Sequence, residues 1–155
     1  MPNHFHIYIF TPRLDQVKAE VKTESDENKF AISIFLEKLG KAYAQYFNTK
    51  YKRTGGLFEG KFKATHIKTD SQAKYNFSYI HLNPIKLIDS KWRENGIKNF
   101  QESIKFLENY RWSSYIDYKG ILRSENKILD RNHFLQYFKD IKDFDDEILE
   151  WLKLP

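Results

Sequence analysis

The 155-residue chain has no cysteine, only six glycines and four prolines, and no apolar run long enough to cross a bilayer. The absence of cysteine excludes disulfides, thiolate metal sites and cysteine nucleophiles. The first residues are polar and do not form a signal peptide. These absences fit a cytoplasmic protein that has no membrane partner.

Aromatic side chains are abundant and occur along the whole length, with 13 Phe, 10 Tyr and 3 Trp. This pattern predicts a folded chain, and the length predicts one domain with a substantial core. The net charge is +5 and the isoelectric point is about 9.2. A basic protein of this kind favours a polyanionic partner.

The positive charge is concentrated in the middle of the chain, where only Glu59 opposes six cations. These cations are Lys50, Lys52, Arg53, Lys61, Lys63 and Lys68. Residues 140–150 are mostly acidic instead. The asymmetry indicates that nucleic acid meets the middle of the chain, although two solvated faces would give the same pattern.

Helical and strand-like segments alternate along the sequence. Apolar residues recur at three- and four-residue steps, which predicts helices, in residues 32–47, 72–82 and 100–110. The stripe of the first of these helices is expected to face a core. Residues 4–10 and 57–67 alternate as strands do. The last part, residues 119–155, predicts one or two small helices.

Two histidines stand two residues apart near the start of the chain. In a strand, side chains at i and i+2 share one face, so His4 and His6 would lie side by side. Two imidazole nitrogens so placed could bind one metal ion. On its own such a pair is more often structural or on the surface than metal-bound.

A tyrosine and an asparagine stand four residues apart at the end of the 72–82 helix, just before Pro84. That spacing stacks Tyr79 and Asn83 on one helix face. A tyrosine hydroxyl can act as a covalent nucleophile, and an amide oxygen can ligate a metal. Tyr75, one turn earlier, is the rival nucleophile. Asn83 could equally serve only to end the helix.

Basic and aromatic residues are interleaved in the second strand-like segment and the turn before it. Arg53, Lys61, Lys63, Phe58 and Phe62 form this set. Phosphates on the cations and bases on the rings would hold a single strand of DNA. The alternative is that the lysines protect a sheet edge.

Five motifs stand in one order along the chain. They are Met1-Pro-Asn-His-Phe-His, Tyr46-Phe-Asn48, Arg53-Thr-Gly-Gly-Leu-Phe-Glu-Gly-Lys-Phe-Lys63, Tyr79-Ile-His-Leu-Asn-Pro84 and Arg111-Trp-Ser-Ser-Tyr115. In content and order they resemble the HUH single-tyrosine transposases, and within them the REP-associated tyrosine transposases. The resemblance covers roughly residues 1–118.

The resemblance implies an enzyme that nicks and rejoins single-stranded or hairpin DNA with a divalent cation, Mg²⁺ or Mn²⁺. It implies that His4 and His6 bind the metal with help from Asn83. It also implies that Tyr79 is the nucleophile that forms a 5′-phosphotyrosine intermediate. It also implies an α+β fold, a ferredoxin-like antiparallel sheet with helices on one face. Residues 1–118 would form the catalytic domain, and residues 119–155 a C-terminal helical extension.

The chain departs from this family at its start, because family members have a strand, a helix and another strand before the histidine motif. The resemblance therefore implies a sheet that is incomplete at its N-terminal side. Three outcomes follow. The chain is an inactive remnant, it completes the sheet by pairing with a second copy as a homodimer, or it is part of a longer reading frame.

Three other functions compete with the nuclease. A non-catalytic remnant would bind nucleic acid without any chemistry. A zinc-dependent hydrolase would use His4, His6 and a third ligand, but no His-Glu-x-x-His or comparable motif is present. A purely structural protein would make the order of the motifs a coincidence.

Overall fold

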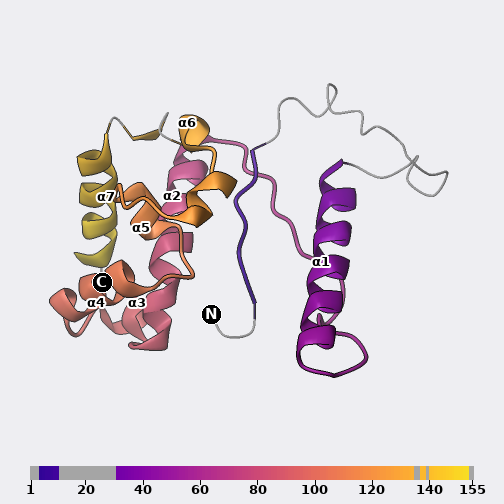
Figure 1. Ribbon diagram of the computed structural model, residues 1–155. Helices are drawn as coiled ribbons and strands as arrows, with labels where there is room; N and C mark the ends of the chain where they lie inside the picture. Colours follow the sequence, from indigo (N-terminus) through magenta and orange to yellow (C-terminus); the bar gives the residue numbers. More distant parts are fainter. Residues whose placement is uncertain (1–3, 11–30, 135–136, 139, 154–155) are drawn as a thin grey trace. The chain divides into compact units, whose positions relative to one another are not determined.

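The computed structural model describes residues 4–10, 31–134, 137–138 and 140–153. It divides the chain into two compact units, Met1–Tyr8 with Ile67–Pro155 and Ile9–His66. We call them the large unit and the small unit. Figure 1 shows the helices of both.

The large unit is built around α2 (Asp70–Leu82). Thr69 caps this helix, since its hydroxyl oxygen accepts a hydrogen bond from the Gln72 backbone N–H at 3.2 Å. At the other end Pro84 lies in the first turn of the 3-10 helix η2 (Asn83–Leu87), which follows α2 without a break. The predicted helix over 72–82 is confirmed, with its start two residues earlier.

Six further helices of the large unit follow η2 within the described residues. They are α3 (Trp92–Asn95), α4 (Phe100–Asn109), α5 (Tyr115–Tyr118), the 3-10 helix η3 (Ser124–Ile128), α6 (Arg131–Phe134) and α7 (Ile141–Lys153). The predicted helix over 100–110 is therefore confirmed as α4. α7 packs along α2 (Figure 1).

The core of the large unit is aromatic at its centre. The Phe77 ring of α2 lies 5.7 Å from Phe144 of α7 and 5.0 Å from Tyr118 of α5, measured between ring centroids. Ile148 and Leu107 are fully buried beside them. Part of the segment after residue 118 thus contributes directly to this core.

Polar side chains are buried in the same core. His81 Nδ1 lies 2.8 Å from the Phe77 carbonyl oxygen, and His81 Nε2 lies 2.8 Å from Ser114 Oγ. Because a carbonyl oxygen only accepts, Nδ1 carries the proton and the Ser114 hydroxyl donates to Nε2. Burial lowers the pKa of His81 to about 4, although the Phe77 carbonyl and Asp117 oppose the shift.

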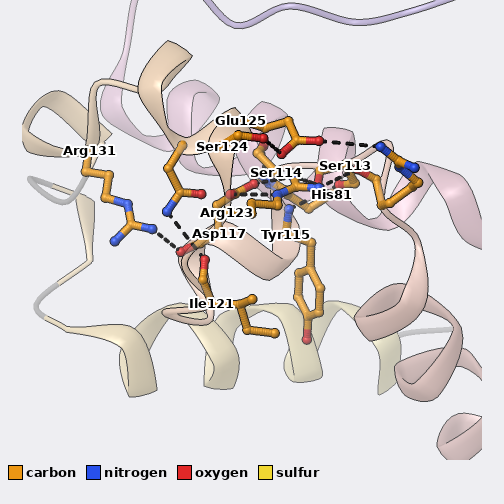
Figure 2. A network of polar contacts seen from close by, with 12 residues as sticks. His81, Ser113, Ser114, Tyr115, Asp117, Ile121, Arg123, Ser124, Glu125 and Arg131 are labelled. Carbon is orange, nitrogen blue, oxygen red and sulfur yellow. Dashed lines mark hydrogen bonds and ion pairs between the residues drawn. The ribbon is translucent and has the colours of Figure 1, made fainter.

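Asp117 is the centre of the adjoining charged network, which Figure 2 shows. Arg123 binds both carboxylate oxygens of Asp117, its Nε donating to Oδ1 at 2.8 Å. Arg131 Nη2 donates to the Asp117 backbone carbonyl oxygen at 2.6 Å. The two bonds from Arg123 satisfy a carboxylate that is almost fully buried.

The small unit contains α1 (Ala31–Lys50), the helix predicted over 32–47. Its apolar stripe was expected to face a core, and that part of the prediction is wrong, because no residue of α1 is buried. Tyr43 and Tyr46 are about half exposed. The Phe58 ring lies 6.1 Å from that of Tyr43 and covers only part of this face.

The predicted ferredoxin-like antiparallel sheet is wrong, because the described residues are all-helical or irregular and contain no strand. Residues 4–10 and 61–67 have no regular secondary structure. Alternation favours a strand, but a strand forms only where a neighbouring segment completes the hydrogen-bond ladder. Phe5 and Phe10 accordingly stay more than half exposed.

None of the helices in the described ranges has the length and apolar character that crossing a lipid bilayer requires.

Candidate functional site

One helical turn joins Tyr79 and Asn83. The backbone N–H of Asn83 donates to the Tyr79 carbonyl oxygen, so the two residues end α2 together. Asn83 is only 1% exposed, whereas Tyr79 is half-buried. The predicted spacing of one helical turn between the two residues is therefore present, with Tyr79 partly exposed and Asn83 buried.

The N-terminal histidine segment reaches this turn. Asn83 Nδ2 lies 3.2 Å from His6 Nε2, and the His6 ring lies 5.8 Å from the Tyr79 ring, edge to face. Asn83 donates to His6 when the imidazole carries its proton on Nδ1. The structure thus brings an imidazole, a phenol and a carboxamide together from segments more than 70 residues apart.

His4 lies beside His6, with ring centroids 5.1 Å apart. The two side chains are neighbours, as the i and i+2 spacing predicted, although their segment is not a strand. Partial desolvation lowers the pKa of His6, and the charge that His4 can carry lowers it further. A lowered pKa keeps the ring neutral near pH 7, which is the form that binds metals.

The Asn83 side chain has one unsatisfied atom. Its Oδ1 is buried without a hydrogen-bond partner in the described part of the chain. A buried amide oxygen without a partner is costly, and a bound cation would satisfy it. His4, His6 and Asn83 could offer a divalent metal two nitrogens and one oxygen. In the arrangement seen, His6 Nε2 accepts from Asn83 Nδ2, so a bound metal would replace this contact.

In the described part of the chain, no carboxylate completes this set. Among the described residues no group of three or more His, Cys, Asp or Glu side chains could hold a metal. A cation here would depend on the Asn83 oxygen and on oxygens of a substrate.

Sequence reasoning missed Arg93. Its Cζ lies 4.1 Å from the centroid of the Tyr79 ring. Arg93 belongs to α3, which is separated from α2 by η2 and a turn, so helical spacing from Tyr79 does not predict the contact. No pattern in the sequence singles it out.

Tyr75, the rival nucleophile, lies next to Tyr79. The two rings are stacked at 6.3 Å with an interplanar angle of 23°. Tyr75 also meets Trp151 of α7, ring to ring, at 5.1 Å. The His6 ring lies against Tyr79, so Tyr79 is the tyrosine that adjoins the two histidines.

The residues predicted to bind DNA lie in the small unit. They are Arg53, Phe58, Lys61, Phe62 and Lys63, and all five are exposed. Arg53 Cζ lies 5.7 Å from the Phe47 ring centroid, and its Nη2 donates to the Gly56 carbonyl oxygen at 3.3 Å. Lys61, Phe62 and Lys63 lie in an irregular segment, not on the predicted strand.

Comparisons with models of protein families, with curated proteins and with solved structures give no match.

Proposed function

We propose that this chain is a single-stranded DNA endonuclease and strand transferase of the transposase type. The observation that carries the proposal is the contact of His6 with Asn83 and Tyr79 at the end of α2. It joins the residues that the resemblance assigns to metal binding and to nucleophilic attack. A cytoplasmic location is part of this proposal.

The proposed reaction is a transesterification. The Tyr79 hydroxyl oxygen forms a bond to phosphorus while the bond from phosphorus to the 3′ oxygen breaks. The phenolic proton passes, in net terms, to the departing 3′ oxygen. The products are a 5′-phosphotyrosine and a free 3′ hydroxyl, and a 3′ hydroxyl can reverse the step on another strand.

A divalent cation, Mg²⁺ or Mn²⁺, would be held by His4, His6 and Asn83. When bound it would offset negative charge on a non-bridging phosphate oxygen. The neutral form of His6 and the unsatisfied Asn83 oxygen support this assignment.

The small unit supplies the proposed contacts to DNA. Lys61 and Lys63 offer exposed charges to phosphates, and the half-exposed rings of Phe58 and Phe62 offer faces on which bases stack. Arg53 adds a guanidinium to this set. Both kinds of contact tolerate many sequences, so they would support binding more than recognition.

The test is a covalent adduct. A library of single-stranded oligonucleotides labelled at the 3′ end is incubated with the protein and Mn²⁺, and labelled protein is sought on a denaturing gel. We expect an adduct that is lost with EDTA and in Tyr79→Phe, which removes only a hydroxyl. Tyr75→Phe is the matched control and should keep the adduct.

Two results would contradict this assignment. An adduct that persists in Tyr79→Phe and is lost in Tyr75→Phe would move the nucleophile one turn along α2. No adduct under any condition would remove the nuclease function.

A non-catalytic nucleic-acid-binding remnant is the second candidate. The observation that favours it is the irregular, exposed histidine segment, which lacks the predicted sheet in the described residues. It predicts hairpin binding that is unchanged by Tyr79→Phe, without an adduct. A homodimer in which two copies pair this segment would favour the enzyme instead. Size-exclusion chromatography with and without DNA tests whether the chain forms such a dimer.

A further inference from the structure

Arg93 is held against the proposed nucleophile by its own short helix. Trp92, its neighbour in α3, is buried in the core of the large unit and anchors this helix. The Arg93 guanidinium extends over the Tyr79 ring, with 4.1 Å between Cζ and the ring centroid. At that distance a cation is attracted to the face of an aromatic ring.

No carboxylate among the described residues offsets the charge of Arg93. Within the described ranges Arg93 forms no ion pair, whereas Arg123 is bound to buried Asp117. A guanidinium has five N–H donors in a planar fork that matches the oxygens of a phosphate. Arg93 therefore has donors to offer to an anion beside Tyr79.

The site around it also favours an anion. The four clustered side chains of His4, His6, Tyr79 and Asn83 include no acid. A phosphate diester that approached the Tyr79 hydroxyl would thus meet the Arg93 cation and neutral or cationic imidazoles, without a like charge from these residues.

We infer that Arg93 binds the phosphate that Tyr79 attacks, an inference that rests on the proposed function. As the bond from Tyr79 to phosphorus forms and the bond to the 3′ oxygen breaks, negative charge builds on the non-bridging oxygens. Donors placed where charge develops act most strongly in the transition state. Arg93 would supply them while its stacking holds the ring in place.

The test compares three substitutions on adduct formation with the 3′-labelled library and Mn²⁺. Arg93→Met keeps a long side chain that can pack on the ring but carries no charge. Arg93→Lys keeps a charge. Lys91→Gln is the matched control, because it removes an exposed cation two residues away. Circular dichroism checks that each variant folds.

We expect Arg93→Met to lower the single-turnover rate at saturating DNA roughly 100-fold. The DNA concentration that gives half the maximal rate should change little, since one phosphate contact is a small part of strand binding. Arg93→Lys should recover part of the rate, and Lys91→Gln should keep all of it.

Three outcomes overturn the inference. Full activity of Arg93→Met shows that packing alone is needed, and an equal loss in Lys91→Gln shows a general effect of charge. If the wild-type chain forms no Tyr79 adduct, the proposed function and this inference fail together. If the wild-type chain forms the Tyr79 adduct and Arg93→Met forms it equally fast, only this inference fails.

Discussion

His81 and Asn83 are both buried at the end of α2, yet their surroundings give them different roles. His81 has a partner for each ring nitrogen and is part of the core. Asn83 has a partner for its nitrogen and none for its buried oxygen in the described residues. Complete hydrogen bonding makes His81 a structural residue, whereas the unsatisfied oxygen of Asn83 is consistent with the proposed metal site.

The buried His81 makes the stability of the fold depend on pH. Its pKa is about 4 in the folded chain and 6.5 in the unfolded reference. Between these values the unfolded state binds more protons, so the free energy of unfolding falls as the pH falls. The full difference corresponds to about 3 kcal/mol, lost once the pH is below the folded pKa. Urea unfolding across this pH window measures it.

Two variants separate His81 from other titrating groups. His81→Phe should flatten the pH dependence, although it lowers stability because Ser114 loses its acceptor. His66→Asn, at an exposed position, should leave the dependence as it is. An unchanged slope in His81→Phe would show that other groups cause it.

At the scale of elements, α2 is the support on which both the core and the site depend. One face of it packs on α7 through Phe77, and its end carries Tyr79 and Asn83. Removing contacts between α2 and α7 should therefore lower stability before it alters the chemistry of the site.

Ile148 tests this packing, since its side chain is 0% exposed. Ile148→Ala should lower the free energy of unfolding by about 2–5 kcal/mol, because it leaves a cavity. Ile128→Ala, at a residue 85% exposed, should change it by less than about 0.5 kcal/mol. Denaturant unfolding of both variants checks this. Equal effects would mean that α7 contributes little to the core.

Helices were predictable where local signals agreed. Apolar residues at three- and four-residue steps predict α2 and α4, and Pro84 marks the end of α2. The predicted strands failed because pairing depends on a distant partner that alternation in residues 4–10 does not supply. The exposed stripe of α1 likewise depends on packing that its own sequence does not specify.

At the scale of the whole molecule, the two units divide the proposed work. The large unit carries His4, His6 and Tyr79. The small unit carries the exposed side chains of Lys61, Lys63, Phe58 and Phe62. Binding of DNA and attack on it should therefore respond to different substitutions.

Removing Lys61 and Lys63 together tests the binding role. We expect the double variant Lys61→Gln with Lys63→Gln to have a weaker salt dependence. The slope of log affinity against log salt concentration for single-stranded DNA should become shallower by about 1.4. Affinity should fall for all sequences alike. Fluorescence anisotropy with single-stranded oligonucleotides measures both. Lys127→Gln with Lys142→Gln, exposed cations of the large unit, should not change the slope. A slope unaffected by the first pair would exclude these lysines from the interface.

The site was partly predictable from sequence. Helical spacing predicts that Tyr79 and Asn83 share one face. The resemblance implies that His4 and His6 lie near them, and the structure has a contact between His6 and Asn83. Arg93 was not foreseeable, because its position over Tyr79 depends on how the chain turns between η2 and α3. Such a turn results from the burial of Trp92, a tertiary effect.

The hydrogen bond from the Asn83 backbone to the Tyr79 carbonyl has one more consequence. It holds the backbones of Tyr79 and Asn83 one helical turn apart, a rise of about 5.4 Å along the helix axis. Movement of α2 would therefore carry both residues together. If the chain acts as proposed, their backbone spacing would be the same before and after strand cleavage.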